Sequence, residues 1–329
     1  MSRFSRRRRR RWIAAAIIIA AVLIAASAYG YAETYHVEVK DYSFADPDVP
    51  AAFAGTRIVL VTDIHRGPFL SQERVRSLVD RVNALEPDMV VLGGDYVYKD
   101  TGYAESCFTE LARLRAPLGV FAVLGNHDYG AHEDERPGPA DVIAAAADTG
   151  ITLLRDAGVW VEEEGQRIRV GGVSDYDEGA PRLTPIIEGT REEDLVLLVS
   201  HNPDFAERLP AGTVDLVLSG HTHGGQVTFF GLWAPYIPSE YGQKYRTGVV
   251  TNDVTTVMVS NGIGTSTVPP VRLFARPQIV VITLQSGAPG KAGAAGVVTG
   301  GAAGAAGAAT AAATAATGDR PGGRSLILE

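Results

Sequence analysis

Short apolar runs that end in polar residues recur along the middle of the chain. Each run is rich in Val, Leu and Ile, and each is followed directly by histidine, carboxylate or amide side chains. Apolar runs of four to eight residues are typical of buried strands. The sequence therefore predicts five buried strands with polar carboxyl ends, at Ile58–Thr62, Met89–Leu92, Val120–Leu124, Leu195–Ser200 and Val214–Ser219.

The spacing of the first three strands predicts a parallel sheet. Between the first two lies Gln72–Leu85, whose apolar residues recur at helical intervals and form one stripe. Asp63 lies 32 residues before Asp95, which lies 31 residues before Asn126. A strand–helix–strand unit takes about thirty or more residues. The ends of these strands should therefore meet at one edge of the sheet, where ligands bind in open α/β sheets.

Later apolar runs lack this regular helix spacing. They are expected to form a second sheet packed on the first, and they include Ile168–Gly172, Thr256–Ser260 and Ile279–Leu284.

The N-terminus predicts a membrane segment. Residues 1–11 carry seven arginines and no acid, and residues 12–32 carry no charge. About twenty apolar residues span a bilayer as a helix, and the arginines should stay on the cytoplasmic side. The sequence thus predicts a basic cytoplasmic region (1–11) and a single-pass signal anchor (12–32), which would place the remaining chain outside the cytoplasm.

Two alternatives remain open for this segment. Ala26-Ser27-Ala28 fits a signal cleavage site, so that the protein could instead be exported and released. The arginines after Ser5 also allow twin-arginine export in place of the general route.

Composition divides the rest of the chain. Residues 33–52 hold Pro47 and Pro50 and are expected to be a linker, and 53–285 form the predicted folded domain. Residues 287–318 contain 15 alanines and 9 glycines, a pattern without the proline of collagen and interrupted too often for an alanine helix. The tail 286–329 is therefore expected to be disordered.

Charge and cysteine content limit the chemistry. The formal net charge is −8, and the residues after Arg11 include 23 basic and 38 acidic side chains. Such a body repels a phosphate backbone, so no nucleic-acid partner is expected. Cys107 is the only cysteine, and its apolar neighbours predict a buried structural thiol. A metal would therefore be held by nitrogen and oxygen ligands.

The polar strand ends suit a site for two metal ions. Such a hydrolytic site needs ligands from several strands and a carboxylate that bridges ions about 3.5–4 Å apart. Asp63 and His65 are two residues apart, as are His221 and His223. In extended backbone, each pair would point to one side with Cα atoms about 6–7 Å apart.

Five motifs resemble those of the calcineurin-like metallophosphoesterases, in the same order. They are Asp63-Ile64-His65, Gly93-Gly94-Asp95, Gly125-Asn126-His127-Asp128, the lone His201, and Gly220-His221-Thr222-His223-Gly224-Gly225. The resemblance covers nearly all of residues 56–285. Ser200–Asp204, Ser260–Gly264 and Pro270–Arg272 look most like the bacterial membrane-associated branch, which includes enzymes similar to UDP-2,3-diacylglucosamine pyrophosphatases.

This resemblance implies an αββα sandwich of two mixed sheets flanked by helices. It also implies two divalent ions, with Mn, Zn, Fe and Co all compatible with the donors. Asp63, His65 and His223 would hold one ion, Asn126, His201 and His221 the other, and Asp95 would bridge them. His127 would protonate the leaving oxygen, and Asp128 would orient His127.

Three functions are compatible with the sequence. The first is hydrolysis of a phosphodiester or pyrophosphate bond in a lipid-linked or nucleotide-sugar substrate, and the second is a broad extracytoplasmic phosphomonoesterase. The third is a non-catalytic surface binding protein, which the intact set of ligands disfavours.

A cluster of aromatic residues follows the last motif. Residues 227–245 contain Phe229, Phe230, Trp233, Tyr236, Tyr241 and Tyr245, interrupted by prolines and glycines that indicate a loop. Two alternatives remain open: the aromatics fill the core, or the loop borders the active site and helps to engage a lipid-linked substrate, with Lys244 and Arg246 near its headgroup.

Overall fold

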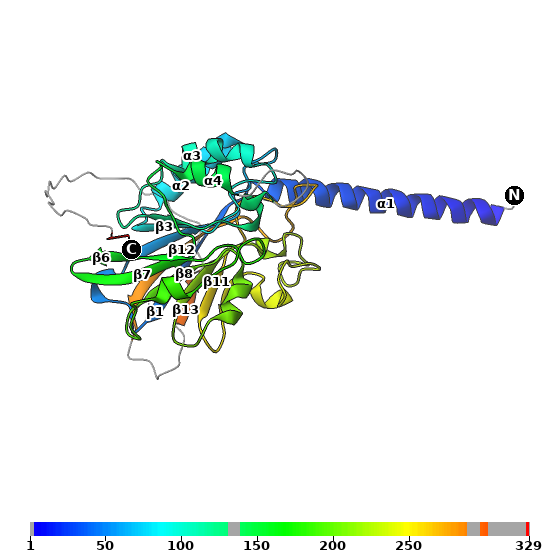
Figure 1. Cartoon of the computed structure of the whole chain (residues 1–329). Helices are drawn as coiled ribbons and strands as arrows, with labels where there is room; N and C mark the ends of the chain where they lie inside the picture. The colour runs from blue at the N-terminus through cyan, green and yellow to red at the C-terminus, as the bar shows by residue number, and fades with distance from the viewer. Residues whose placement is uncertain (1–2, 131–138, 288–296, 302–326, 329) are drawn as a thin grey trace, which may run out of the picture.

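Two seven-stranded sheets pack face to face in the computed structural model, with helices on their outer faces (Figure 1). The structure describes residues 3–130, 139–287, 297–301 and 327–328. The first sheet has the strand order β13-β1-β12-β2-β3-β4-β5. Its strands are β1 (Glu38–Asp46), β2 (Arg57–Val61), β3 (Met89–Leu92), β4 (Val120–Ala122), β5 (Thr152–Leu153), β12 (Gln278–Ser286) and β13 (Val297–Gly301).

The second sheet has the order β10-β11-β9-β8-β7-β6-β14. Its strands are β6 (Ala157–Glu163), β7 (Gln166–Gly172), β8 (Val196–Val199), β9 (Leu216–Ser219), β10 (Gly248–Thr251), β11 (Thr256–Val259) and β14 (Ile327–Leu328). Both sheets contain parallel and antiparallel pairs. The expected αββα sandwich of two mixed sheets is confirmed.

Strand β2 explains why the apolar runs are continuous. Ile58 and Leu60 face the core between the two sheets, whereas Val59 and Val61 face the helical layer. That layer consists of α2 (Gln72–Ala84), α3 (Ala104–Leu111) and α4 (Ala140–Ala146). Because both faces of the strand are buried, every position favours an apolar side chain.

The second sheet is covered on its outer face by shorter elements. Phe205 of the 3₁₀ helix Pro203–Arg208 and Ile186 of α5 (Thr184–Ile187) pack against residues of β8, β9 and β11. Shorter 3₁₀ turns lie at 51–53, 101–103, 126–129, 223–225 and 242–245.

Several strand predictions are confirmed and one is wrong. Strands β2, β3 and β4 pair in parallel, as the spacing predicts, and β7 and β11 lie in the second sheet. The run 279–284 instead forms β12 of the first sheet, antiparallel to β2. The prediction placed this strand in the second sheet because no regularly spaced helix precedes it. That argument fails here, because an antiparallel strand can join a sheet without a crossover helix.

The segment 33–52 is not an irregular linker. Its strand β1 pairs in parallel with β12 over all nine residues, from Glu38 to Asp46. In the tail, 297–301 pairs with β1 and 327–328 pairs with β6, which differs from the disorder expected there. The remaining tail positions 288–296, 302–326 and 329 lie outside the described residues.

Helix α1 (Arg3–Glu33) projects from the body (Figure 1). It is long and apolar enough to cross a membrane, and it is exposed along most of its length. Its last turns are fixed to the body, because Gly30 O accepts a hydrogen bond from Arg272 N at 2.9 Å and Glu33 Oε2 accepts one from Phe274 N at 2.8 Å.

Candidate metal centre

The predicted ligands converge from the carboxyl ends of five strands. Strands β2, β3 and β4 of the first sheet and β8 and β9 of the second end beside one another, and each is followed by one of the five motifs. All seven predicted metal ligands lie in this one region, linked by the contacts described below.

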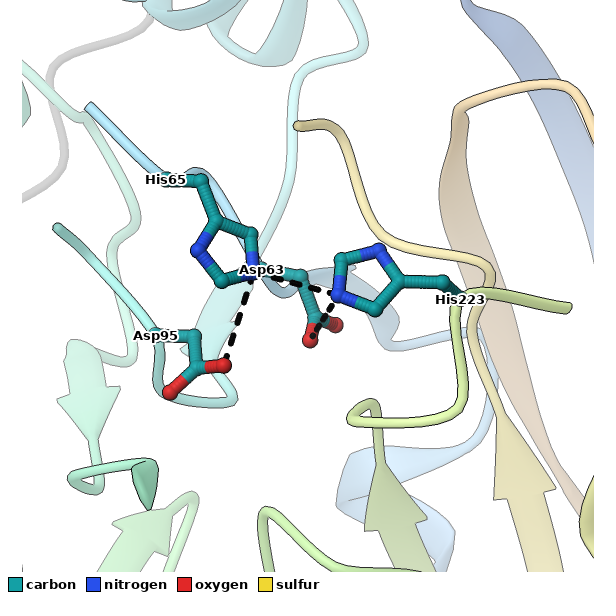
Figure 2. Close-up of side chains that lie close together, drawn as sticks. All are labelled: Asp63, His65, Asp95 and His223. Atoms are coloured by element: carbon teal, nitrogen blue, oxygen red, sulfur yellow. Dashed lines mark hydrogen bonds and ion pairs between the residues drawn. The ribbon is translucent and has the colours of Figure 1, made fainter. Parts of the chain in front are cut away.

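One group of side chains gathers four ligand atoms. The Nε2 atoms of His65 and His223 lie 3.1 Å apart. His223 Nε2 lies 3.4 Å from Asp63 Oδ1, and His65 Nε2 lies 3.5 Å from Asp95 Oδ2. One ligand atom from each of the four residues fits within 4.8 Å of the other three (Figure 2). This spacing suits a single metal ion.

A second group lies beside the first. Asn126 Oδ1 is 3.2 Å from His201 Nε2 and 3.0 Å from His221 Nδ1, and the two histidine nitrogens are 3.3 Å apart. Asp95 Oδ2 is 3.3 Å from His201 Nε2. The same oxygen atom of Asp95 therefore contacts both groups.

The protonation of these side chains fits metal binding. Burial lowers the pKa of His65 to about 3 and that of His221 to about 4, and it holds the pKa of His223 well below its ordinary value. Three neutral imidazoles thus keep a lone pair at neutral pH. With carboxylate and amide oxygens beside them, they form the mixed nitrogen and oxygen donor set that divalent transition metals accept.

Burial opposes ionisation of Asp95, yet the charge of His201 beside it holds the pKa of Asp95 well below the ordinary value. Conversely, although burial favours neutral His201, Asp95 raises its pKa well above the ordinary value. His201 therefore supplies a positive charge next to Asp95 in the protein alone. A metal ion between the two groups would supply that charge instead.

Five of the predicted ligand residues adopt strained backbone conformations. The expectation of extended backbone at the two Asp/His and His/His pairs is wrong, because these residues have left-handed φ values. The φ angles are 51° at Asp63, 50° at His65, 57° at Asp95, 67° at His221 and 51° at His223. Each costs of order 1–3 kcal/mol, and such strain clusters at functional sites. The chain leaves each strand by a sharp turn, which directs these side chains toward one another.

Two glycines allow this close approach. A Cβ atom on Gly220 would lie 2.7 Å from Thr62 Cβ and would also collide with the Asp63 carboxylate. A Cβ atom on Gly125 would lie 2.7 Å from Asp95 N and 2.8 Å from His201 Cε1. Side chains at either position would displace ligands.

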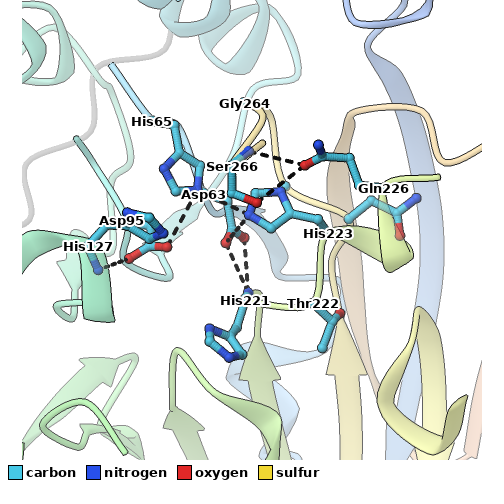
Figure 3. A network of polar contacts seen from close by, with 12 residues as sticks. Asp63, His65, Asp95, His127, His221, Thr222, His223, Gln226, Gly264 and Ser266 are labelled. Atoms are coloured by element: carbon cyan, nitrogen blue, oxygen red, sulfur yellow. Dashed lines mark hydrogen bonds and ion pairs between the residues drawn. The ribbon is translucent and has the colours of Figure 1, made fainter. Parts of the chain in front are cut away.

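His127 and Asp128 occupy different environments. The backbone N–H of His127 donates to Asp95 Oδ1 at 2.9 Å, and its ring centroid lies 4.7 Å from that of His65 (Figure 3). Asp128 is fully buried, and its carboxylate accepts backbone hydrogen bonds from Asp95, Tyr96 and Gly125 at 2.8–2.9 Å. These contacts give Asp128 a role in holding the backbone of the site.

Sequence analysis missed two charged residues at the centre. Asp177 Oδ2 lies 3.8 Å from His221 Nε2 and accepts a hydrogen bond from Asn202 Nδ2 at 3.0 Å. It follows β7, whose end lies at the same edge, so the rule used for the other strands would have found it. Arg272 is fully buried and its Nη2 lies 3.3 Å from His223 Nδ1. Pro270–Arg272 carries part of the family resemblance, but that resemblance did not predict the contact of Arg272 with His223.

Comparisons with known proteins identify the family. Residues 56–225 match the model of the calcineurin-like phosphoesterase family. The chain is 29% identical over 270 residues to the uncharacterized metallophosphoesterase YkuE of Bacillus subtilis, covering 80% of this chain and 91% of the relative.

Two further relatives extend the comparison. An uncharacterized metallophosphoesterase of Aquifex aeolicus is 32% identical over 271 residues, covering 80% of this chain and 97% of the relative. A Bos taurus protein named transmembrane protein with metallophosphoesterase domain is 28% identical, covering 72% of this chain and 55% of the relative. The family match and the identity to the Aquifex protein show that this chain belongs to the calcineurin-like phosphoesterase family, and it is a metal-dependent phosphoesterase.

Proposed function

We propose that this enzyme hydrolyses phosphodiester or pyrophosphate bonds with two divalent metal ions, which Mn, Zn, Fe or Co could supply. Asp95 carries the proposal, because its Oδ2 atom lies 3.5 Å from His65 Nε2 and 3.3 Å from His201 Nε2. Asp95 would bridge the two ions. Asp63, His65 and His223 would hold the first ion, and Asn126, His201 and His221 the second.

When bound, two such ions activate water and neutralise the oxygens of a phosphoryl group. His127 protonates the leaving oxygen, a role supported by its half-buried position beside His65 and Asp95. Asp128 supports catalysis by fixing the backbone N–H groups of Asp95 and Gly125, which set the positions of the bridging carboxylate and of the Asn126 loop.

The bond that is cleaved can be tested with two chromogenic substrates. Bis-p-nitrophenyl phosphate is a diester and p-nitrophenyl phosphate is a monoester, and both release the same leaving group. The proposal expects a higher kcat/KM for the diester after loading with Mn²⁺ or Zn²⁺. A higher value for the monoester would instead assign a broad phosphomonoesterase.

We assign the native substrate to lipid-linked or nucleotide-sugar phosphates, and the enzyme to a membrane. Helix α1 supports anchoring, as does the relative named as a transmembrane protein. The arginines before the apolar segment support a cytoplasmic N-terminus and a catalytic domain, 53–285 with strand β1, on the other side. Intact mass measurement tests retention of the anchor: the whole chain has a mass of 34.8 kDa, and signal cleavage would remove about 3 kDa of it.

A further inference from the structure

An apolar surface that the metal centre does not use lies on two neighbouring segments, 227–236 and 268–274. Its large side chains are exposed, with relative exposures of 77% for Phe230, 81% for Leu232, 73% for Tyr236 and 72% for Val268. Phe229 and Phe274, on the same two segments, are also exposed. Contiguous exposed apolar surface marks a site for a membrane or a protein partner. These six residues are called the apolar surface below.

The two segments form one unit. Thr228 N donates to Leu273 O at 3.0 Å, and Leu273 N donates to Gln226 O at 2.9 Å. The rings of Phe230 and Phe274 pack with centroids 5.2 Å apart. The apolar side chains are therefore presented together by a paired backbone.

Backbone strain accompanies this exposure. Phe230 has a φ of 53° and Phe274 a φ of 54°, which is the left-handed region that bulky residues avoid. Neither side chain gains burial in the core in return. Backbone strain that is not offset by burial of the side chain indicates that these two residues have a functional role.

The apolar surface adjoins the end of the membrane-spanning helix. The rings of Tyr29 and Phe274 lie 5.8 Å apart, and Arg272 N donates to Gly30 O at 2.9 Å. Glu33 Oε1 and Oε2 bind Arg276 Nε and Phe274 N. Figure 1 shows an orange loop beside the base of α1. If helix α1 spans the bilayer, these contacts set the depth of the apolar surface along the bilayer normal.

The length of the uncharged segment gives this depth. The uncharged residues 12–32 cover about 31 Å at 1.5 Å per residue, close to the hydrocarbon thickness of about 30 Å. Exposed Trp12 at one end and Tyr29 and Tyr31 at the other fit the two aromatic belts of a membrane protein. Gly30, and with it Arg272 and Phe274, therefore lies at the boundary between hydrocarbon and headgroups.

We propose that the apolar surface inserts into the interface of the bilayer that α1 spans, as a second membrane contact. The contact holds the metal centre toward the headgroups. One cavity of about 170 Å³ is lined by residues of both features, by Thr222 and His223 and by Tyr236 of the apolar surface. If the proposed function holds, this arrangement favours a phosphate group carried on a lipid.

The basic residues of this region are already engaged. Arg246 Nη2 donates to Gly231 O at 2.8 Å, and Lys244 pairs with Glu207. Both stabilise the protein next to the apolar surface. Insertion of apolar side chains, rather than attraction of these two cations to anionic lipids, is therefore the main expected source of binding.

The experiment uses the full chain in phosphatidylcholine proteoliposomes. Cys107 is fully buried, so a single introduced cysteine can be labelled selectively with an environment-sensitive fluorophore. The labelled variants are Leu232→Cys and Val268→Cys. The control is Glu164→Cys, an exposed position in the turn between β6 and β7, on the side of the body away from α1 (Figure 1). Quenchers are attached to the lipid acyl chains or dissolved as iodide.

Insertion predicts quenching by the lipid quencher that is severalfold stronger at positions 232 and 268 than at 164, with the reverse order for iodide. Adding Phe230→Ser should reduce lipid quenching at 232. Equal, weak lipid quenching at all three positions would overturn the proposal. Protection from iodide without lipid quenching would also overturn it, and would assign the surface to a second copy of the chain. The measurement needs neither metal nor substrate, so it is independent of the proposed hydrolysis.

Discussion

The backbone N–H of Asp95 donates a hydrogen bond to Oδ2 of Asp128 at 2.9 Å. Oδ2 also accepts the N–H of Gly125, and Oδ1 accepts that of Tyr96. One buried carboxylate thereby fixes two loops that follow neighbouring strands, β3 and β4. The position of Asp95, the proposed bridging residue, therefore depends on the buried carboxylate of Asp128.

Asp128→Asn should lower both stability and metal affinity. The amide of asparagine has the same shape as the carboxylate but only one acceptor oxygen. The three backbone N–H groups use both oxygens of Asp128, so at least one buried donor loses its partner in the variant. The expected cost is about 1–3 kcal/mol. Thermal unfolding of the metal-free protein measures it, with Asp253→Asn, an exposed position, as the control. An unchanged melting temperature would contradict the proposed role of Asp128 in holding the backbone of the site.

His127→Ala should keep both metals and slow hydrolysis by roughly 10² to 10⁴. The defect should shrink for p-nitrophenol esters, whose acidic leaving group needs little protonation, relative to alkyl esters. Steady-state rates on the two substrate classes, with metal content measured in parallel, make the comparison. An equal loss on both classes would assign His127 a purely electrostatic role.

Asp177→Asn should weaken the second metal site selectively. Its carboxylate lies 3.8 Å from His221 Nε2, on the side of the ring opposite the Nδ1 atom that faces Asn126. Outer carboxylates that orient a ligating histidine typically contribute 10- to 100-fold in affinity. Calorimetric Zn²⁺ titration should therefore show one weakened site and one unchanged site. Two unchanged affinities would contradict this positioning role.

Asp215→Asn should stabilise the protein at pH 8 more than at pH 5. Burial, with the charges of Asp46 and Asp48, raises the pKa of Asp215 from 3.8 to about 7. The folded state thus binds this proton more tightly than the unfolded state. The resulting stability is fully present below pH 3.8 and is lost as the pH rises through about 7.

The variant removes the charge and with it the penalty at high pH. Its melting temperature relative to the unaltered protein should be higher at pH 8 than at pH 5, by roughly 2–4 °C for each kcal/mol. The same difference at both pH values would contradict a raised pKa at this position.

The strand ends were predictable because burial on both faces makes a distinctive run of Val, Leu and Ile, and each run ends in polar residues at the predicted metal ligands. Strand β1 was not predictable from the sequence. Its exposed and half-buried positions are occupied by polar residues such as Glu38, Lys40 and Asp41, which are also common in linkers. Its pairing with β12 joins residues some 240 positions apart and leaves no local periodicity.

Roles that depend on three-dimensional contacts were harder to predict. Asp128 follows His127 directly, and its predicted role in orienting the imidazole stays a prediction. The structure adds a contact that the sequence did not indicate, because the Asp128 carboxylate accepts hydrogen bonds from backbone N–H groups after β3. The aromatic loop illustrates the same limit. Of its six aromatic side chains only Tyr245 is buried, and composition alone does not separate it from exposed Phe230.

The metal content of Asp95→Asn tests the central claim most directly. The protein should be loaded with Mn²⁺, freed of excess ion and analysed by mass spectrometry, with circular dichroism to verify the fold. The unaltered chain should hold two ions, and Asp95→Asn should hold one or none and lose hydrolysis of bis-p-nitrophenyl phosphate, because both ions share this charge. Two bound ions with normal turnover in Asp95→Asn would contradict the dinuclear assignment.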